Sequence, residues 1–373
     1  MQPLFCSLRR KLPSVAVVLA AAAFLPLLSL RAETKATWTD AAELTLHGRG
    51  WVDSLSPYDR FPGRAGEIVR PPVWALSRDA AGLYVDFITD SPRVAARWSL
   101  TRERIGMAHM PATGVSGLDL YVWDARELRW RWLANGRPTA YPENEVTLVN
   151  NLPVKERQYR LYLPLYNGIA SLAIGTDGGV RDAGPDPRKP VVIYGTSITQ
   201  GASASRPGMA YPALLGRQLG RNVINLGFSG NARGEPEVAE LLAELDPAVF
   251  VLDPLPNMSG PTVTPLLDEF ITILRRKHPR TPIVLVESIV YANAHLVSSR
   301  ESRHTDSSRQ LREVWEARVE AGDRNLFLVA ADQLLGADGE DTVDGTHPTD
   351  LGFHRMAEGL FPVIRRLLDR AGE

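Results

Sequence analysis

The sequence predicts an α/β fold: a parallel sheet in the C-terminal half, preceded by an antiparallel, jelly-roll-like β-sandwich. Two observations carry this prediction. From about residue 190 onward, short continuous apolar segments alternate with helical patterns, as in parallel sheets covered by helices on both faces. Between about residues 34 and 179, short segments of alternating apolar and polar residues are separated by turn residues, without helical periodicity.

The first 32 residues are typical of a secretory signal peptide. Three basic residues at positions 9–11 precede an apolar run over residues 12–30, and Ala32 offers a small residue at a cleavage point. The run is long for such a peptide, so an uncleaved membrane anchor is the alternative. We therefore expect an exported protein, periplasmic or secreted, with no stable membrane association if the signal is cleaved.

Composition excludes several classes of protein and site. The 373 residues carry a net charge of −1, which removal of residues 1–32 would change to −5, so nucleic acid is not an expected partner. The single cysteine, Cys6, lies before the apolar run, and the mature chain would contain no disulfide, cysteine–zinc site or cysteine nucleophile. No metal and no cofactor is expected.

Residues 33–180 are predicted to form the β-sandwich domain. Strand patterns include residues 83–88, 118–123 and 159–163, and turns are expected at residues 79–82, 135–136 and 166–168. Seven of the eight tryptophans lie in this region. They could form a sugar-stacking surface, but packing in the core and between strands is the more common role for such residues.

Residues 181–190 contain three prolines and many charges and are predicted to form a linker. Residues 191–373 form the second predicted domain. Its strands are expected at residues 191–194, 222–226, 248–252, 283–287 and 326–329. Its helices are expected at residues 209–219, 236–245, 263–277, 305–321 and 351–368.

Ser197 is the candidate nucleophile. It follows the first strand of this domain and Gly195, which permits a sharp turn. In an open parallel sheet, ligands bind beyond the carboxyl ends of the strands. The alternative is an ordinary turn in which Ser197 hydrogen-bonds its own backbone. Gly-x-Ser-x-Gly is absent because position 199 is Thr, which argues against the nucleophile elbow of α/β-hydrolases.

His347 is the candidate base, and Asp344 is the residue expected to orient it. The two lie in Asp344-Gly345-Thr346-His347-Pro348, before the last predicted helix. In a tight turn, this spacing lets the carboxylate reach one imidazole nitrogen and leaves the other free for a serine. The alternative is that Asp344 caps the turn and His347 is only exposed.

Gly230 and Asn257 are candidate oxyanion donors, together with the N–H of Ser197. Gly230 follows the second strand in a glycine-containing loop, where the backbone can approach a ligand closely. Asn257 follows the third strand in a proline-framed loop, and its amide is a neutral donor. A glycine turn and an ordinary polar loop residue are the alternatives.

In this order, Gly195-Thr196-Ser197, Gly230, Asn257 and Asp344-x-x-His347 resemble the SGNH (GDSL-type) hydrolases over about residues 190–370. The resemblance implies a flavodoxin-like three-layer α/β/α fold. It also implies a Ser–His–Asp hydrolase whose oxyanion is held by the Ser197 N–H, the Gly230 N–H and the Asn257 side chain.

A narrower resemblance covers more of the chain. Gly117-Leu118-Asp119-Leu120-Tyr121 is similar to the Gly-x-Asp-Leu-Tyr motif of the β-domain in one SGNH branch, and residues 206–212 also look like that branch. Its members include carbohydrate esterases. The sequence departs from the family in two places. The first block is Gly-Thr-Ser rather than Gly-Asp-Ser, and Met258 replaces the usual Asp after Asn257. Neither departure removes a catalytic residue type, so both bear on the substrate preference implied by the resemblance and not on the catalytic assignment.

We therefore expect a serine esterase that hydrolyses short-chain esters, acetyl esters first among them, on a carbohydrate or another acylated small molecule. Two alternatives remain. One is a lipid esterase or thioesterase of the same fold. The other is a glycan-binding protein with an inactive hydrolase domain, against which the complete set of candidate site residues argues.

Overall fold

Five strands form a parallel sheet in the C-terminal half of the chain, as predicted. They are β11 (Val191–Gly195), β12 (Val223–Gly227), β13 (Val249–Asp253), β14 (Ile283–Val286) and β15 (Leu326–Val329). Their order across the sheet is β12-β11-β13-β14-β15, the order of flavodoxin-like folds. The computed structural model describes residues 35–372, so the expected signal peptide lies outside the described residues.

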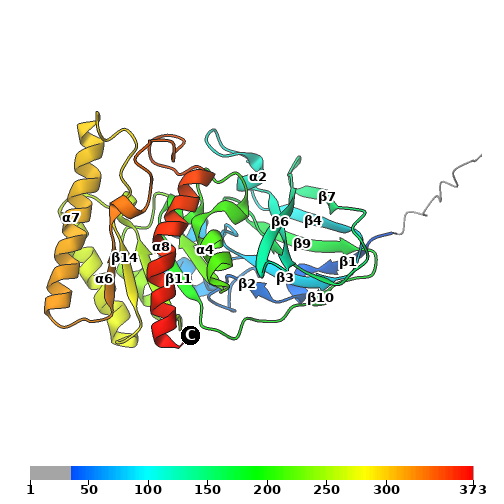
Figure 1. The fold of residues 1–373 in the computed structure, drawn as a ribbon, viewed down its shortest axis with the longest axis horizontal. Coiled ribbons are helices and arrows are strands. Elements are labelled where there is room, and N and C mark those ends of the chain that lie inside the picture. The colour runs from blue at the N-terminus through cyan, green and yellow to red at the C-terminus, as the bar shows by residue number, and fades with distance from the viewer. Residues whose placement is uncertain (1–34, 373) are drawn as a thin grey trace, which may run out of the picture. The chain divides into compact units, whose positions relative to one another are not determined.

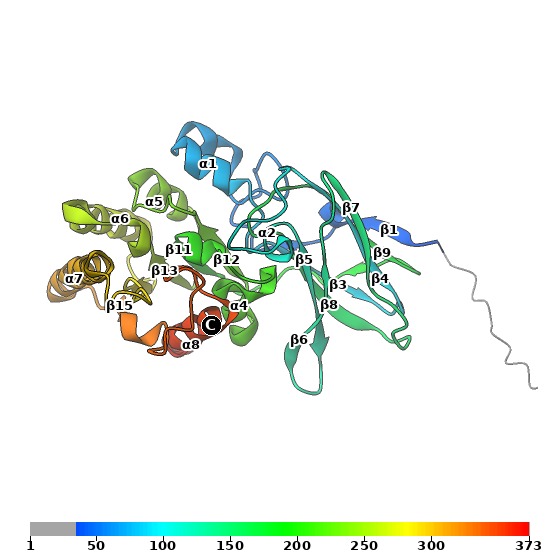
Figure 2. The same ribbon diagram turned by 90° about the horizontal axis from the view of Figure 1, so that it is seen from above.

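Helices cover both faces of this sheet, because alternate strand residues face opposite sides. Val191 and Ile193 face a core that includes α4 and α8, whereas Val192 and Tyr194 face a core that includes α5, α6 and α7. Figure 2 shows the strands between these two groups of helices. The helices are α3 (Ser197–Gln200), α4 (Tyr211–Leu219), α5 (Pro236–Leu242), α6 (Val263–Lys277), α7 (Ser298–Glu320) and α8 (Asp350–Ala371).

Local sequence signals mark both ends of α8, whereas the start of α7 differs from its predicted position. α8 begins after Thr349, whose side chain accepts a hydrogen bond from the Gly352 N–H, and it ends at Gly372 with a positive φ of 69°. α7 begins at Ser298, seven residues before the predicted start at residue 305. Its first turns are polar, so no apolar period marks them.

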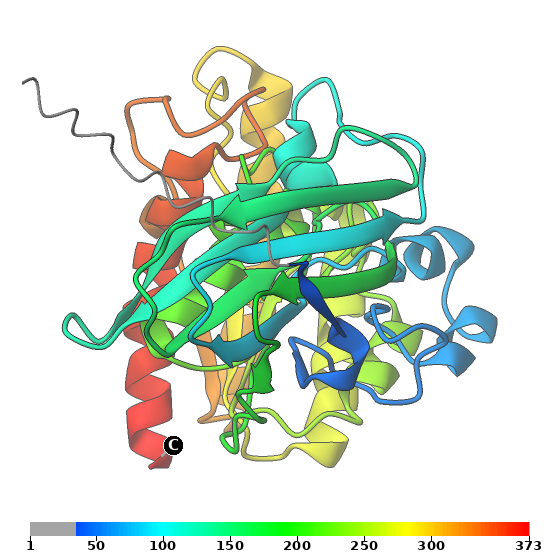
Figure 3. The same ribbon diagram turned by 90° about the vertical axis from the view of Figure 1, so that its right-hand side faces the viewer.

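The N-terminal half contains two antiparallel sheets, and the predicted sandwich is confirmed (Figures 1 and 3). One sheet has the order β1-β9-β4-β7 and the other β10-β3-β8-β5-β6, with β2 paired to β3. The strands are β1 (Thr37–Asp40), β2 (Leu46–His47), β3 (Tyr84–Thr89), β4 (Val94–Leu100), β5 (Leu118–Asp124), β6 (Arg129–Gly136), β7 (Glu143–Val149), β8 (Arg157–Tyr162), β9 (Ile169–Thr176) and β10 (Arg181–Asp182).

The sandwich core is formed by side chains that alternate along the strands. Val85 and Phe87 from one sheet meet Ala96 and Trp98 from the other in a single buried cluster. The opposite face of β3, β8 and β5 carries polar and aromatic side chains. That outer face therefore remains available for contacts outside the sandwich.

Two local predictions in this half are wrong. Asn135-Gly136 is not a turn, because both residues lie in β6, where Gly136 pairs with Leu118. Two short helices, α1 (Pro71–Ser77) and α2 (Ala112–Val115), lie where only strands were expected. α1 has seven residues and begins with two prolines, so it is too short to show a helical period.

The two halves share packed side chains. Residues Trp51, Phe61 and Val73 belong to the same buried cluster as Leu226 and Phe250 of the parallel sheet. Residues from Ala36 onward form one compact unit. The expected linker 181–190 begins with β10, which pairs with β3. Within residues 35–372, no helix is long and apolar enough to span a membrane.

Candidate active site

Ser197 lies at the carboxyl end of β11, in the first turn of α3, and is 7% exposed. The Thr196 hydroxyl accepts a hydrogen bond from the Ile198 N–H at 3.2 Å, which caps the short helix. A Cβ at Gly195 would lie only 2.0 Å from the Thr199 hydroxyl oxygen and 2.9 Å from the Asp253 carbonyl oxygen. Only glycine fits this turn, which holds the serine in place.

His347 connects the serine to a carboxylate. Its Nε2 lies 3.0 Å from the Ser197 Oγ, and its Nδ1 lies 2.7 Å from an oxygen of Asp344. The other Asp344 oxygen accepts hydrogen bonds from the N–H groups of Thr346 and His347, at 3.0 and 2.8 Å. The three-residue spacing closes a turn in which one carboxylate fixes both the loop backbone and the imidazole ring.

The electrostatics of this turn favour an ionised Asp344. Partial burial by itself would raise the pKa of Asp344. The hydrogen bonds from the backbone and side chain of His347 outweigh it and hold that pKa below its ordinary value. An ionised carboxylate at Nδ1 places the ring proton there, which leaves the Nε2 lone pair facing the serine hydroxyl.

The backbone of Phe228 connects the loops of Gly230 and Asn257 to the loop that carries Ser197. The Phe228 N–H donates to the Gly195 carbonyl at 2.8 Å, and the Phe228 carbonyl accepts from the Asn257 amide at 3.4 Å. Two residues later, Gly230 has a φ of +69°. Among residues 35–372, no acceptor is found for the N–H of Gly230 or of Ser197. These groups are free to donate to a bound molecule.

A pocket of about 430 Å³ lies over His347. It is lined by Ser229 and Asn231 from the Gly230 loop and by residues of the N-terminal half, among them Arg102 and Arg104. Residues from both halves therefore surround the site.

His109 also comes from the N-terminal half. Its ring stacks on the ring of His347, with the centroids 5.4 Å apart. No spacing pattern in the sequence predicted that His109, Arg102 and Arg104 belong to the site. They lie in the loop between β4 and α2, which only the tertiary structure brings close to His347.

Buried polar side chains form hydrogen bonds with the backbone of Ser197 and with the neighbouring residues of its loop. The Tyr166 hydroxyl donates to the Ser197 carbonyl at 3.2 Å. Asp253, at the end of β13, accepts hydrogen bonds from the hydroxyls of Thr199 and Tyr211, at 3.0 and 2.9 Å. Burial raises the pKa of Asp253 to about 7, against the effect of these two hydrogen bonds. In the described part of the chain, no group of three or more His, Cys, Asp or Glu side chains is arranged to hold a metal ion.

Two family models match the chain. The GDSL-like lipase/acylhydrolase family matches residues 188–365. A family described as the N-terminus of SGNH-hydrolase-type esterases matches residues 36–181. No curated protein sequence matches the chain.

Several solved structures share this fold. A protein named as a GDSL-like lipase from Bacteroides ovatus is 37% identical with a TM-score of 0.84, over 90% of this chain and 98% of that one. The salicylyl-acyltransferase SsfX3 of a tetracycline biosynthetic pathway is 21% identical with a TM-score of 0.69, over 92% and 99%. A family two carbohydrate esterase from Cellvibrio japonicus is 14% identical with a TM-score of 0.58, over 90% and 98%. The last two similarities concern the fold alone.

Proposed function

The chain belongs to the GDSL-like lipase/acylhydrolase (SGNH) family and is a carboxylic ester hydrolase, and from this premise we propose that it removes acetyl groups from carbohydrate by a Ser197–His347–Asp344 mechanism. The observation that carries the proposal is the continuous hydrogen-bond chain from the Ser197 Oγ through His347 to Asp344, beside an open pocket. A nucleophile, a base and a group that orients the base are what acyl transfer by serine requires.

In the first half of the reaction, the Ser197 Oγ attacks the ester carbonyl carbon while His347 Nε2 takes the hydroxyl proton. The tetrahedral intermediate then breaks its bond to the alcohol oxygen, which receives that proton. The product is a free alcohol and an acyl group bound to Ser197. Asp344 stabilises the imidazolium that forms between the two proton transfers.

In the second half, water attacks the acyl-enzyme and gives its proton to His347. Collapse of the second tetrahedral intermediate releases acetate and restores the Ser197 hydroxyl. The N–H groups of Ser197 and Gly230 and the amide of Asn257 are the donors that we assign to the oxyanion. Loss of one such donor typically lowers turnover by about 10²–10³.

Three considerations support a carbohydrate acetyl ester as substrate. Solved structures with this two-part fold include a carbohydrate esterase. The pocket is lined by the charged Arg102 and Arg104 and also by the apolar Pro72, Leu76 and Met107. The two arginines offer hydrogen-bond donors to the hydroxyl groups of a carbohydrate. Export, proposed from residues 1–32, fits an extracellular glycan as substrate.

A lipid esterase or thioesterase is the second candidate, and the name of the Bacteroides ovatus relative favours it. Hydrolysis of 4-nitrophenyl esters from acetate to laurate distinguishes the two. We expect kcat/KM to fall steeply beyond the acetate and propionate esters. A maximum at octanoate or longer would support the lipid esterase instead.

The nucleophile is tested by Ser197→Ala with 4-nitrophenyl acetate and with a fluorophosphonate probe. We expect the variant to lose nearly all turnover and to gain no probe mass, whereas the wild type gains one adduct. Ser302→Ala, on the exposed face of α7, is the matched control and should retain both the turnover and the probe adduct of the wild type. Equal rates in Ser197→Ala and the wild type would remove Ser197 from the mechanism.

A further inference from the structure

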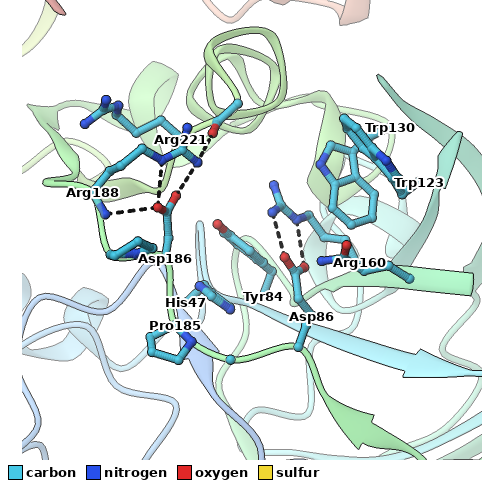
Figure 4. A pocket seen from close by; sticks show the side chains of 15 residues that line it. His47, Tyr84, Asp86, Trp123, Trp130, Arg160, Pro185, Asp186, Arg188 and Arg221 are labelled. Carbon is cyan, nitrogen blue, oxygen red and sulfur yellow. Dashed lines mark hydrogen bonds and ion pairs between the residues drawn. The ribbon is translucent and has the colours of Figure 1, made fainter. Parts of the chain in front are cut away.

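A second pocket, of about 320 Å³, lies against the outer face of the sheet β10-β3-β8-β5-β6 (Figure 4). The segment 183–188 and the turn Gly220-Arg221 form its other wall. The mechanism above uses none of these residues. We infer that this pocket is a saccharide-binding site, and that it takes an uncharged sugar ring of a glycan.

Strand alternation and register build the face. Trp123 of β5 pairs directly with Trp130 of β6, and Asp86 of β3 pairs with Arg160 of β8. Paired residues on antiparallel strands point to the same side of a sheet. The sandwich core takes the alternate residues, such as Leu161. The aromatic and charged side chains therefore gather outside the core, in one pocket.

Trp123 and Trp130 form one side of the pocket. Both are half-buried, and their rings meet edge to face with the centroids 5.5 Å apart. The Arg160 guanidinium lies over the Trp130 ring at 4.4 Å, which fixes the position of that ring. Rigid, partly exposed indoles offer a flat apolar surface to the C–H face of a sugar at little cost in side-chain entropy.

Four of the charged groups of the pocket form two ion pairs, and a fifth, Arg221, donates a hydrogen bond to the Lys189 carbonyl at 2.7 Å. Arg160 binds Asp86 through two hydrogen bonds of 2.8 and 2.7 Å, and Arg188 binds Asp186 through two of 2.8 Å. Figure 4 shows these pairs on opposite sides of the pocket. Because the carboxylates already compensate these two arginines, the pairs hold no unmatched charge for an ion. Their remaining lone pairs and N–H groups can serve hydroxyl groups.

His47 supplies a polar atom that lacks a partner. It is 6% exposed and stacks on Tyr84 with the ring centroids 4.9 Å apart, yet its Nε2 has no hydrogen-bond partner among the described residues. Burial lowers the pKa of His47, so the ring is neutral at neutral pH. An unpartnered buried nitrogen is costly. Because His47 lines the pocket, a small shift of its ring would present this nitrogen to a ligand hydroxyl.

This pocket is separate from the catalytic centre. Gly220 and Arg221 precede the first residue of β12, whereas Ser197 follows β11, whose last residue pairs with the last residue of β12. The five residues of β12 therefore separate the two sites, roughly 15 Å at the rise of a strand. A sugar bound here is not the unit deacylated at Ser197. It anchors another part of the same glycan, a role that rests on the proposed function.

The inference is tested by binding rather than turnover, so that its outcome is independent of the proposed catalytic function. The full chain carrying Ser197→Ala is titrated by ligand-observed NMR with the methyl glycosides of glucose, galactose, mannose and xylose. Glucuronate and inorganic sulfate serve as anionic probes. We expect saturable binding of at least one neutral glycoside, unaffected by added salt.

Variants locate the binding. Trp123→Ala and His47→Ala should each weaken it about tenfold or more, whereas Trp123→Phe, which keeps an aromatic face, should weaken it less. Trp38→Ala is the matched control, because Trp38 also lies against an arginine, Arg97, but outside the pocket. Melting curves identify any variant that fails to fold, and Trp123 is exposed enough for its truncation to be tolerated.

Three results would overturn the inference. They are the absence of saturable binding by every neutral glycoside, binding that Trp123→Ala leaves unchanged, and binding of the anionic probes alone with loss in salt. The last result would identify an anion site instead.

Discussion

Three contacts on the His347 ring define its state. Asp344 meets Nδ1, the Ser197 hydroxyl meets Nε2, and the His109 ring lies over its face. The first two set the tautomer and direction of the ring, and the third limits its rotation. The sequence spacing anticipates only the first of these contacts, since Ser197 and His109 come from distant segments.

Asp344→Asn tests the orienting role of this carboxylate. The asparagine amide would donate to Nδ1 and so place the ring proton on Nε2, facing the serine. We expect kcat on 4-nitrophenyl acetate to fall by about 10³–10⁴ in a variant that still melts cooperatively. Asp338→Asn, which removes an exposed contact with Arg355, is the control and should keep full activity. A variant that retained a tenth of the activity would contradict the assignment.

Asp253 shows how burial makes one carboxyl sensitive to pH. Its pKa is about 7 in the folded chain and near 4 in an unfolded one. A raised folded pKa means that the folded state binds the proton more tightly. The stability that the neutral carboxyl contributes is therefore present below about pH 4 and is lost as the pH rises to about 7.

Asp253→Asn removes this titration and keeps an oxygen to accept from Thr199 and Tyr211. The difference in melting temperature, variant minus wild type, should rise by several degrees between pH 4.5 and pH 8. Differential scanning calorimetry at a series of pH values measures it. A difference that stayed constant with pH would show that Asp253 does not titrate in this range.

At the scale of elements, the Gly-x-Asp-Leu-Tyr motif of β5 joins the two halves of the chain. Asp119 is fully buried and binds the Arg206 guanidinium at 2.7 Å and the Gly208 N–H at 2.9 Å. A Cβ at Gly208 would lie 2.6 Å from the Tyr121 ring. The two motifs that resemble one SGNH branch therefore meet each other across the boundary.

The same contacts lead on to the last helix. The Thr113 hydroxyl, just before β5, donates to the Ser205 carbonyl at 2.6 Å, and the Ser205 N–H donates to Asp350 at 2.9 Å. Asp350 begins α8, three residues after His347. The β-domain motif thus supports the loop that carries the proposed base.

Asp119→Ala should cost about 3 kcal/mol of folding free energy, because it leaves the Arg206 charge largely buried without its partner. Urea denaturation measures the loss. Asp369→Ala is the matched control: it removes an exposed pair with Arg365 and should cost less than about 1 kcal/mol. Equal losses of folding free energy in the two variants would show that the buried pair contributes no more to stability than the exposed pair.

At the scale of the molecule, the N-terminal half completes the core of the hydrolase half. The guanidinium of Arg60 is fully buried and donates to the carbonyls of Asn225 and Gly227, at 3.1 and 2.7 Å. The Phe61 ring packs against the Phe228 ring at a tilt of 41°, with the ring centroids 5.0 Å apart. These residues lie at the edge strand β12 and beside the Gly230 loop.

A fragment that begins at Pro190 should therefore fail to fold on its own. It would expose the apolar side of β12 and leave the Asn225 and Gly227 carbonyls without Arg60. We expect an aggregated or molten product without near-ultraviolet circular dichroism, whereas the chain from Lys35 folds cooperatively. A soluble fragment with a cooperative melt and esterase turnover would contradict this expectation.

Much of the fold could be predicted from the sequence, because strand and helix periods are local properties. The strand 326–329 and the helix 263–277 match the predicted bounds. A local signal fails where the same residues are compatible with two conformations. Asn135-Gly136 is typical of a turn, but it continues β6 because Gly136 pairs with Leu118 on the neighbouring strand. The domain limits and the catalytic roles stay predictions.

The sequence by itself determined the fold class and one close pair, Asp344 and His347, because a three-residue turn is a local geometry. Only the tertiary structure brought the Ser197 hydroxyl within 3.0 Å of His347, 150 positions away. It alone also set His109 over that ring and gathered Trp123, Arg160 and His47 into one pocket. Contacts between distant segments depend on how sheets stack and which strands pair, and no residue spacing encodes either.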